Sequence, residues 1–153
     1  MRHRANLRLR DFDYSTVAAY FVTVCTHNRR CLLGEGDDGK VCLSPIGLIV
    51  RAQIGSLPAR LAVEVDAFVI MPNHVHAVVA LKQRARQASP LRLGIAIGSL
   101  KSGSARELGA PLWQRGFYDH IIRDEADLER VRGYIATNPI QWATDPENPR
   151  RVP

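Results

Sequence analysis

Apolar positions along this chain follow patterns that predict about four β-strands. Three segments rich in β-branched and aromatic residues indicate strands, namely Tyr20–Thr26, Val63–Ile70 and His74–Leu81. An extended segment at Phe117–Ile122 predicts a fourth. Pro72 lacks a backbone N–H donor and separates the second strand from the third. We therefore expect those two strands to form an antiparallel pair joined by a tight turn.

Helix-start signals precede three apolar stripes with helical spacing. Ser44-Pro45 and Ser89-Pro90 each combine an N-cap residue with proline at the first helical position. Asp124 is predicted to cap the last helix, because aspartate side chains accept from free N–H groups there. Pro58 and Pro139 are predicted to end the first and last helices.

The predicted order is strand, helix, strand, strand, helix, strand, helix. It predicts an α+β fold in which an antiparallel sheet of about four strands, in ferredoxin-like order, is flanked by helices packed to one side. The glycine-rich segment Leu33–Lys40 is predicted to be a turn region. The domain is expected at residues 19–142, between a basic arm at residues 1–18 and an irregular tail at residues 143–153.

The charge of the chain favours an anionic partner. Its 153 residues carry 21 Lys and Arg against 15 Asp and Glu, a net charge of +6, and all but three of the 21 are Arg. Basic residues concentrate in the arm and in Ala67–Arg106, which contains no Asp or Glu. This indicates a nucleic-acid surface, because Arg matches phosphate geometry. A compositional preference for Arg on a solvated face explains the same pattern, and charge alone does not decide between the two.

Several other classes of protein are disfavoured. The longest apolar runs, Ala67–Met71 and Ala77–Leu81, are far shorter than the ~20 residues of a membrane-spanning helix. The first residues are basic without an apolar core, so we expect no secretory signal and no membrane partner. Three cysteines without metal-binding spacing are expected to be buried and reduced in the cytoplasm: Cys25, Cys31 and Cys42.

The motif His74-Val75-His76 is the first candidate for chemistry. Residues i and i+2 of a strand share a face, so the two imidazoles can converge on one ion while Val75 points to the opposite layer. Two packed, hydrogen-bonded histidines would give the same pattern. The turn at Met71–Asn73 favours the metal interpretation, because it places the pair at an accessible end of the sheet.

The second candidate pair lies on the last predicted helix. Tyr134 and Asn138 are four residues apart and share one helical face. One interpretation is a structural tyrosine followed by a helix-ending asparagine. The other is a phenolic nucleophile with a carboxamide that ligates a metal or orients the attacked group.

These motifs, in this order, resemble the REP-associated tyrosine transposases of the HUH class, which is named for its His–hydrophobic–His motif. The resemblance rests on Met71–His76, Trp113–Arg115 and Tyr134–Pro139, and it extends from Tyr14 to about Trp142. It implies that residues 19–142 form an HUH transposase-like catalytic domain. It also implies a substrate of single-stranded DNA with palindromic, hairpin-forming repeats.

The resemblance further implies roles for individual residues. His74 and His76 would bind a divalent cation, Mg²⁺ or Mn²⁺, with Asn138 as a polar third ligand. Tyr134 would attack a phosphorus atom and form a 5′-phosphotyrosine intermediate with a free 3′-OH. A phenol with a pKa near ~10 must lose its proton during attack, and a nearby cation stabilises the resulting charge. The protein would act in the cytoplasm and join the nucleoid when bound to DNA.

Other residues remain candidates for parts of this site. Tyr118 and Tyr20 are alternative nucleophiles, and His120 is an alternative ligand or general base, with a structural role as the simpler interpretation. The residues expected to contact DNA are Lys101, Trp113, Arg115 and Arg123, although core packing or a solvated surface position fits each of them too.

Three functions remain open from the sequence. The first is a metal-dependent strand transferase acting through Tyr134, the second a non-catalytic hairpin-binding protein on the same fold, and the third a metal-dependent phosphodiesterase that uses water. The sequence leaves open whether the chain is a monomer or a homodimer. The transferase hypothesis requires the two imidazoles and the phenol to face one shared space.

Overall fold

The structure is a computed structural model that describes residues 18–82 and 93–151. Residues 1–17 of the predicted basic arm and the predicted cap at Ser89-Pro90 lie outside the described residues. The elements, in chain order, are β1 (Ala18–Cys25), η1 (His27–Arg29), β2 (Gly34–Asp37), β3 (Lys40–Leu43), α2 (Pro45–Arg60), β4 (Val63–Met71), β5 (His74–Leu81), α3 (Leu93–Leu108), β6 (Tyr118–Ile122), α4 (Glu125–Thr137) and η2 (Trp142–Thr144).

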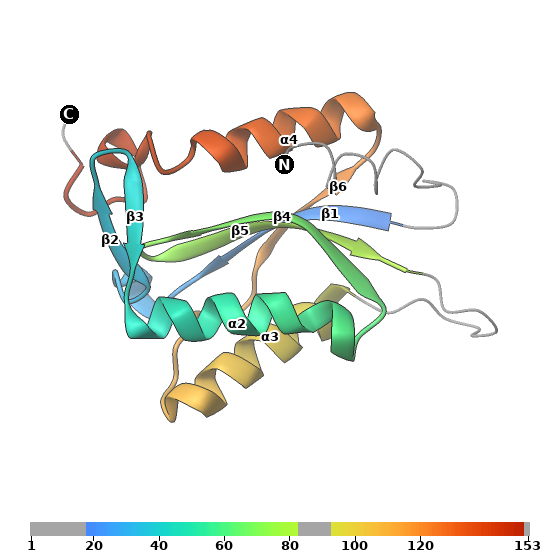
Figure 1. The fold of residues 1–153 in the computed structure, drawn as a ribbon, viewed down its shortest axis with the longest axis horizontal. Coiled ribbons are helices and arrows are strands. Elements are labelled where there is room, and N and C mark those ends of the chain that lie inside the picture. Colours follow the sequence, from blue (N-terminus) through green and yellow to red (C-terminus); the bar gives the residue numbers. More distant parts are fainter. Residues whose placement is uncertain (1–17, 83–92, 152–153) are drawn as a thin grey trace.

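Four of the strands form one antiparallel sheet in the order β4-β5-β1-β6 (Figure 1). The two central strands are β5 and β1, and the edges are β4 and β6. The chain passes from β1 through α2 to β4, and from β5 through α3 to β6. This connectivity is the ferredoxin-like order, so the α+β prediction is confirmed.

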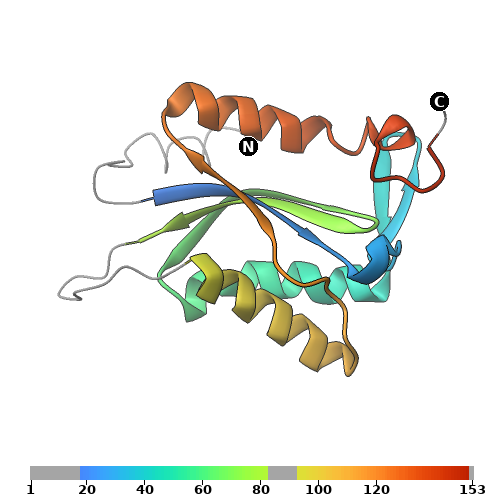
Figure 2. The same ribbon diagram turned by 180° about the vertical axis from the view of Figure 1, so that it is seen from behind.

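Helices cover both faces of this sheet. Figures 1 and 2 show α2 and α3 on one face and α4 on the other. The prediction that the helices pack to one side was therefore wrong. The reason lies in β5, where Val75 and Val79 enter the core beneath α2 and α3, while Val78 and Ala80 enter a second core beneath α4. A strand that is apolar on both faces needs cover on both.

The predicted caps at Ser44 and Asp124 are confirmed. The Ser44 hydroxyl accepts from the Gly47 N–H at 3.1 Å, and the Asp124 carboxylate accepts from the Asp127 N–H at 2.7 Å. Each bond satisfies one of the free N–H groups of a first helical turn. The start of α4 is thereby fixed, and with it the phase of the helix that carries Tyr134.

The predicted end of α2 at Pro58 was wrong, because the helix continues to Arg60. Pro58 lies in the last turn, where it removes only one backbone hydrogen bond. The Leu61 N–H still donates to the Leu57 carbonyl at 2.9 Å, which closes the turn around the proline. A proline so near a helix end marks its boundary only to within a few residues.

The hairpin of β2 and β3 was missed, because its glycines read as a turn. Gly39, with a φ of 75°, does lie in the turn. Gly34 and Gly36 serve close packing instead: an added Cβ would lie 2.4 Å from the Cys42 carbonyl oxygen at the first and 2.2 Å from Trp142 Cδ1 at the second. Both positions lie in the strand, where glycine permits close approach.

The three cysteines are free thiols. Cys25 is partly buried, whereas Cys31 and Cys42 are exposed, so the expectation that all three are buried was wrong. Burial raises the pKa of the Cys25 and Cys31 thiols, which favours their protonated form.

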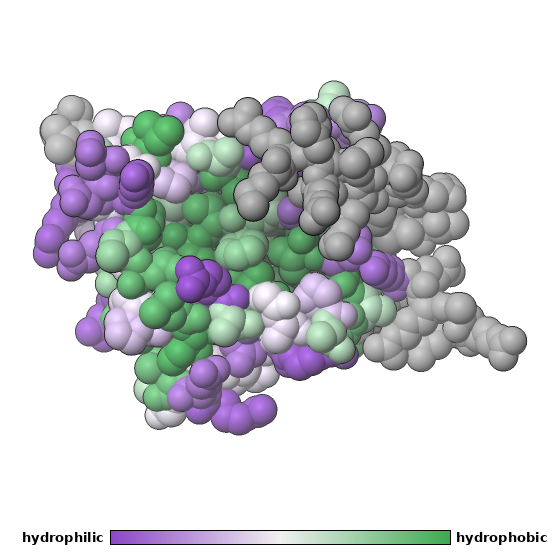
Figure 3. All heavy atoms as spheres, in the orientation of Figure 1, coloured by the Kyte–Doolittle hydropathy of each residue, from purple (hydrophilic) through white to green (hydrophobic). Residues whose placement is uncertain are grey.

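Apolar residues gather on the side of the molecule that carries the β4 edge, between α4 and α2 (Figure 3). The exposed large hydrophobic residues include Leu48 on α2, Phe68 on β4 and Ile140 beyond α4. Tyr118 is also exposed, but it lies on β6 at the opposite edge of the sheet. Within the described ranges, no helix combines the length and the apolar character needed to cross a membrane.

Candidate metal and nucleophile site

The two histidines of β5 point to the face covered by α4. In the sheet His74 pairs with Cys25, and His76 pairs with Thr23, both on β1. Val75 enters the opposite core, as the two-residue period predicts. The imidazoles are almost fully buried, at 1% and 5% exposure, and their ring centroids lie 4.5 Å apart. The strand therefore holds the two rings side by side.

Each imidazole uses its Nδ1 atom for a hydrogen bond to the protein. His74 Nδ1 lies 2.8 Å from Asn73 Oδ1, and His76 Nδ1 lies 2.8 Å from Thr23 Oγ1. Ligating histidines commonly hold one ring nitrogen in this way and bind a metal with the other. The Nε2 atoms of both rings are the ones available for a ligand.

Burial lowers the pKa of both imidazoles. Burial together with the neighbouring His74 lowers the pKa of His76 to about 3. For His74, burial lowers the pKa, while the carboxylates of Asp145 and Glu147 oppose the shift. Both rings are accordingly neutral near pH 7, which is the form that binds a metal ion.

Helix α4 carries Tyr134 over the histidine pair. Its buried stripe consists of Leu128, Val131 and Ile135, and Tyr134 lies beside that stripe with 43% of its surface exposed. The ring contacts His76 edge-on, with centroids 5.2 Å apart. The phenol is therefore adjacent to the imidazoles and also accessible to a substrate.

Asn138 follows Tyr134 by one helical turn, and its carboxamide is buried without a partner for its oxygen. The residue is 1% exposed, and its Oδ1 atom makes no hydrogen bond. A buried, unpaired carbonyl oxygen is unfavourable unless a ligand satisfies it. It can complete a set of oxygen and nitrogen donors with His74 and His76, so the residues fit a divalent cation.

No three His, Cys, Asp or Glu side chains come together as a metal-binding group in the part of the chain that the structure describes. The candidate set is therefore two imidazoles and one amide oxygen. Remaining coordination positions would be open to water or to a phosphate oxygen. An open position is typical of a catalytic site rather than a structural one.

His74 and Tyr134 face a common space. The Asn138 carboxamide and the carboxylates of Asp145 and Glu147 act on the pKa of both side chains. Burial raises the pKa of the Tyr134 phenol, the two carboxylates raise it further, and Asn138 partly offsets the effect. The phenol is thus held in its protonated form in this structure. In the ring contacts, His76 lies between the other two side chains: its centroid is 4.5 Å from that of His74 and 5.2 Å from that of Tyr134.

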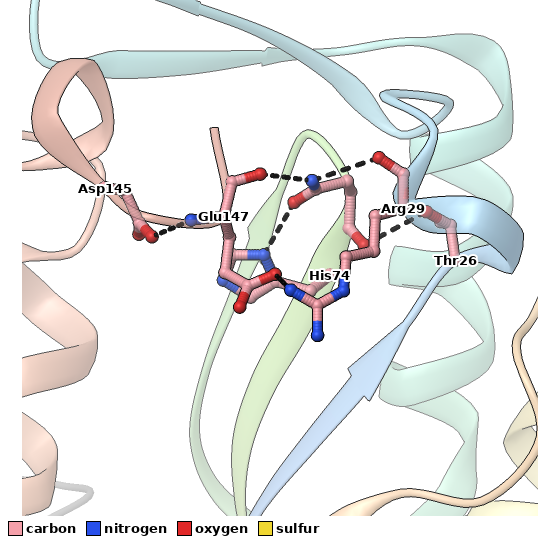
Figure 4. Close-up of polar contacts among 6 residues, drawn as sticks. Thr26, Arg29, His74, Asp145 and Glu147 are labelled. Atoms are coloured by element: carbon pink, nitrogen blue, oxygen red, sulfur yellow. Dashed lines mark hydrogen bonds and ion pairs between the residues drawn. The ribbon is translucent and has the colours of Figure 1, made fainter. Parts of the chain in front are cut away.

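The segment after α4 packs against this site. The Glu147 carboxylate pairs with the Arg29 guanidinium, and Figure 4 shows both beside His74. The indole of Trp142 lies 6.2 Å from the His74 ring, centroid to centroid. Residues 143–151 of the predicted tail are irregular apart from the end of η2, and Glu147 is the one that pairs with Arg29 beside His74.

A cavity of about 740 Å³ adjoins the site. Pro72 and Pro139, the neighbours of Asn73 and Asn138, contribute to its lining together with Trp142. Its charged lining residues include both signs, with cations at Arg29, Arg30 and Arg150 and carboxylates at Glu35, Asp37 and Asp38.

Two of the predicted DNA contacts have structural partners. The Lys101 ammonium donates to the backbone carbonyls of Gln114, at 2.9 Å, and Gly116. The Trp113 indole packs against the core beneath α3, and its N–H donates to the Ser104 hydroxyl at 2.8 Å. Neither side chain joins the ring cluster, which consists of Phe21, His74, His76, Tyr134 and Trp142. Lys101 instead holds the loop that carries Arg115.

The other predicted residues are distributed along β6 and its flanks. Arg115 is exposed on the loop whose neighbour Gln114 donates from its N–H to the carbonyl of Cys25, the strand partner of His74. Arg123 is exposed beyond the far end of β6. Arg115 is thus close to the site end of the sheet, and Arg123 is not.

The alternative nucleophiles and the alternative ligand are also placed. His120 Nε2 lies 2.9 Å from Asp127 Oδ2, so this histidine ties β6 to α4. Tyr20 packs against the core beneath α2 and α3, on the face opposite the site. Tyr118 pairs with Thr23, which pairs in turn with His76, so all three lie in one row across the sheet. Tyr118 therefore lies on the sheet face that carries His76.

Sequence reasoning missed several residues around the histidines, namely Phe21, Thr23, Arg29 and Glu147. Phe21 stacks on His76, with centroids 5.2 Å apart, and Thr23 holds its Nδ1 atom. The odd-numbered residues of β1 share the face of His76, a signal that strand periodicity could have given once the register was known. No comparable signal announces Arg29 or Glu147, because both lie in irregular segments.

The chain has similarity to known proteins in sequence, although no protein-family model matches it. An uncharacterised protein of Haemophilus influenzae is 29% identical over 167 residues, covering 95% of this chain and 93% of that protein. A second H. influenzae protein, named "Putative REP-associated tyrosine transposase", is 29% identical over 93 residues, covering 51% of this chain and 50% of its own.

Solved structures share the fold. The structure of a REP-associated tyrosine transposase bound to a REP hairpin matches with a TM-score of 0.63 at 25% identity, covering 81% of this chain and 67% of that one. A crystal structure named as a "putative transposase" from Deinococcus radiodurans has a TM-score of 0.53 at 17% identity, with 83% and 93% covered, and supports the fold alone. Both kinds of comparison support a transposase-like function. In sequence and in fold, this chain resembles the REP-associated tyrosine transposases.

Proposed function

We propose that this chain is a metal-dependent strand transferase that cleaves and rejoins single-stranded DNA beside a hairpin, through Tyr134. One observation carries the proposal: an accessible phenol lies against a buried pair of neutral imidazoles, next to a buried amide oxygen without a partner. The solved relative bound to a REP hairpin supports hairpin DNA as the partner.

The residues suited to hold the cation are His74 and His76, through their Nε2 atoms, and Asn138, through Oδ1. A bound Mg²⁺ or Mn²⁺ ion would stabilise charge on the phosphoryl oxygens. Phe21 stacks on His76, and Trp142 lies near His74. These two aromatic rings therefore limit the access of water to the two imidazoles from their sides of the site. The site remains open where Tyr134 is exposed.

Tyr134 supplies the nucleophile. As its Oη–P bond forms, the P–O3′ bond breaks, leaving a 5′-phosphotyrosine on the protein and a 3′-hydroxyl on the released strand. The phenol gives up one proton, and the leaving 3′ oxygen takes up one, so the step is balanced. The phosphotyrosine bond replaces a phosphodiester bond of similar type, and attack by a 3′-hydroxyl reverses the step without ATP.

The test is covalent capture. The protein is incubated with Mn²⁺ or Mg²⁺ and an end-labelled single strand that contains a hairpin repeat from beside its own gene. We expect an adduct that survives SDS and disappears when EDTA is added. Hairpin binding without any adduct would favour the non-catalytic alternative, and free cleaved product without an adduct would favour the phosphodiesterase.

Removing either imidazole is expected to separate metal binding from DNA binding. His74→Ala and His76→Ala should each weaken Mn²⁺ binding by about 100-fold or more and abolish the adduct, because each removes a ligand. DNA affinity should change less than about threefold, since phosphate contacts dominate it. Calorimetric Mn²⁺ titration and a DNA-binding assay measure the two effects.

The matched control is His120→Ala, which removes an imidazole that bonds to Asp127 outside the ring cluster. Its Mn²⁺ affinity should equal that of the wild type. A large loss in this variant would instead make His120 a ligand. Equal loss of DNA binding in all three variants would contradict the proposed division of roles.

Tyr118 is expected to stack on a base of the bound strand. Its ring is 62% exposed at the sheet edge, in the same row as Thr23 and His76. Tyr118→Ala should weaken single-strand affinity by about 10-fold, because aromatic–base stacking contributes roughly 1–3 kcal/mol. Tyr118→Phe keeps the ring and should bind like the wild type. Fluorescence anisotropy measures both, and equal affinity for the Ala and Phe variants would rule out stacking.

A further inference from the structure

We propose that Asn73 is a positioning residue that fixes the tautomer of His74, so that the ring carries its proton on Nδ1 and its lone pair on Nε2. The Asn73 Oδ1 and His74 Nδ1 atoms are 2.8 Å apart, and both residues are 1% exposed. The consequence for metal binding rests on the proposed function, whereas the tautomer itself does not.

The orientation of the Asn73 amide follows from its other partners. Its Nδ2 atom lies 2.8 Å from the Glu147 carbonyl oxygen and 3.2 Å from the Arg29 carbonyl oxygen. Backbone carbonyls only accept hydrogen bonds, so the NH₂ group must face them. The exchange of oxygen and nitrogen that often leaves an amide's orientation open is therefore excluded here. The amide oxygen must face His74.

The amide oxygen in turn decides the state of the imidazole. An amide oxygen has no proton to donate, so His74 Nδ1 must donate, and the neutral ring keeps its lone pair on Nε2. His76 differs, because its partner is the Thr23 hydroxyl, which either donates or accepts. The structure therefore assigns one tautomer to His74 and none to His76.

Two segments far apart in the sequence hold Asn73 in place, Thr26–Arg29 at η1 and the segment after η2. Its backbone carbonyl accepts from the Thr26 N–H at 3.0 Å and from the Thr26 hydroxyl at 3.1 Å. Its side chain donates to η1 through Arg29 and to the segment after η2 through Glu147, as Figure 4 shows for these partners around His74. Arg29 has a φ of 53°, which is uncommon for a non-glycine residue. The segment at η1 and the segment after η2 thus both act on the metal site through the side-chain amide of Asn73.

The direct test is the ¹⁵N spectrum of the histidine rings, recorded without metal. Wild-type His74 should show a protonated Nδ1 and an unprotonated Nε2. Asn73→Ala should remove this preference, so that both tautomers of His74 are populated. Asn73→Ser, whose side chain is too short to reach the ring, should do the same and serves if Asn73→Ala does not fold. A wild-type His74 protonated on Nε2 overturns the proposal without any variant.

The second measurement is Mn²⁺ affinity, with Asn148→Ala as the matched control. Asn148 is also a buried asparagine, and its amide bonds to the backbone of Trp142 and Arg150 rather than to a histidine. Both Asn73 variants should weaken Mn²⁺ binding by about 10- to 100-fold, whereas Asn148→Ala should not. An unchanged His74 tautomer in the Asn73 variants overturns the positioning role. If the wild type binds no Mn²⁺, the proposed function loses its metal, and the spectra still decide the role of Asn73.

Discussion

Replacing Tyr134 by phenylalanine is expected to reduce formation of the covalent protein–DNA adduct by about 10³-fold or more, because the substitution removes the attacking oxygen. The ring itself remains, so its contacts with His76 at 5.2 Å and Phe21 at 5.9 Å should be retained. Folding and hairpin affinity should therefore match those of the wild type. SDS gels of the labelled adduct, with a parallel binding assay, measure both quantities.

Tyr118→Phe is the matched control for this experiment. It also removes one hydroxyl from an exposed tyrosine in the same region, but Tyr118 lies on β6 rather than on α4. The adduct should form as in the wild type. Loss in this variant and not in Tyr134→Phe would exchange the two roles. Metal-dependent cleavage that continues in Tyr134→Phe would instead indicate water as the nucleophile.

Replacing Arg132 by leucine is expected to lower the free energy of unfolding by about 3–5 kcal/mol. Arg132 of α4 binds the Asp66 carboxylate of β4 through two hydrogen bonds of 2.7 Å, and the Asp66 side chain is 1% exposed. Without the guanidinium, a buried carboxylate would lose its partner. Urea denaturation measures the change, and an effect below about 1 kcal/mol would contradict it.

Arg130→Leu provides the control on the same helix. The Arg130 side chain is 68% exposed and pairs with Asp127 at the surface, so its loss should cost at most about 1 kcal/mol. Combining Arg132→Leu with Asp66→Leu should recover much of the lost stability, because no buried charge then remains. If the double variant is as unstable as Arg132→Leu alone, packing rather than charge accounts for the effect.

The ion pair of Arg132 and Asp66 also explains how β4 is joined to α4. The register of β4 against β5 shifts between Val65 and Ala67, which makes Asp66 the extra residue of a β-bulge. Bulges redirect individual side chains. Here the redirected carboxylate holds the helix that carries Tyr134 above the histidines.

The order of the strands and helices of the main fold could be predicted, because each has a local signal. The strand His74–Leu81 was predicted with its observed bounds, since proline and a polar turn precede a continuous apolar run. The position of α4 on the second face was not predicted. The apolar stripe of α4 shows that one side of the helix is buried, but it does not show against which face of the sheet that side packs.

The site could be predicted only in part, for a similar reason. The two-residue period brought His74 and His76 to one face, and the four-residue spacing did the same for Tyr134 and Asn138. The contacts that hold the histidines depend on strand register, as with Thr23, or on backbone carbonyls in irregular segments, as with Glu147. Neither leaves a periodic pattern in the sequence.

The absence of a side chain at Gly36 has a consequence for how this protein can vary. A methyl group there would collide with the Trp142 indole, 2.2 Å from its Cδ1 atom, and that indole lies near His74. A substitution at this position of the β2–β3 hairpin would then displace the indole, and its effect would extend to His74. Substitution at Gly36 should thus be poorly tolerated, despite the solvent around this position.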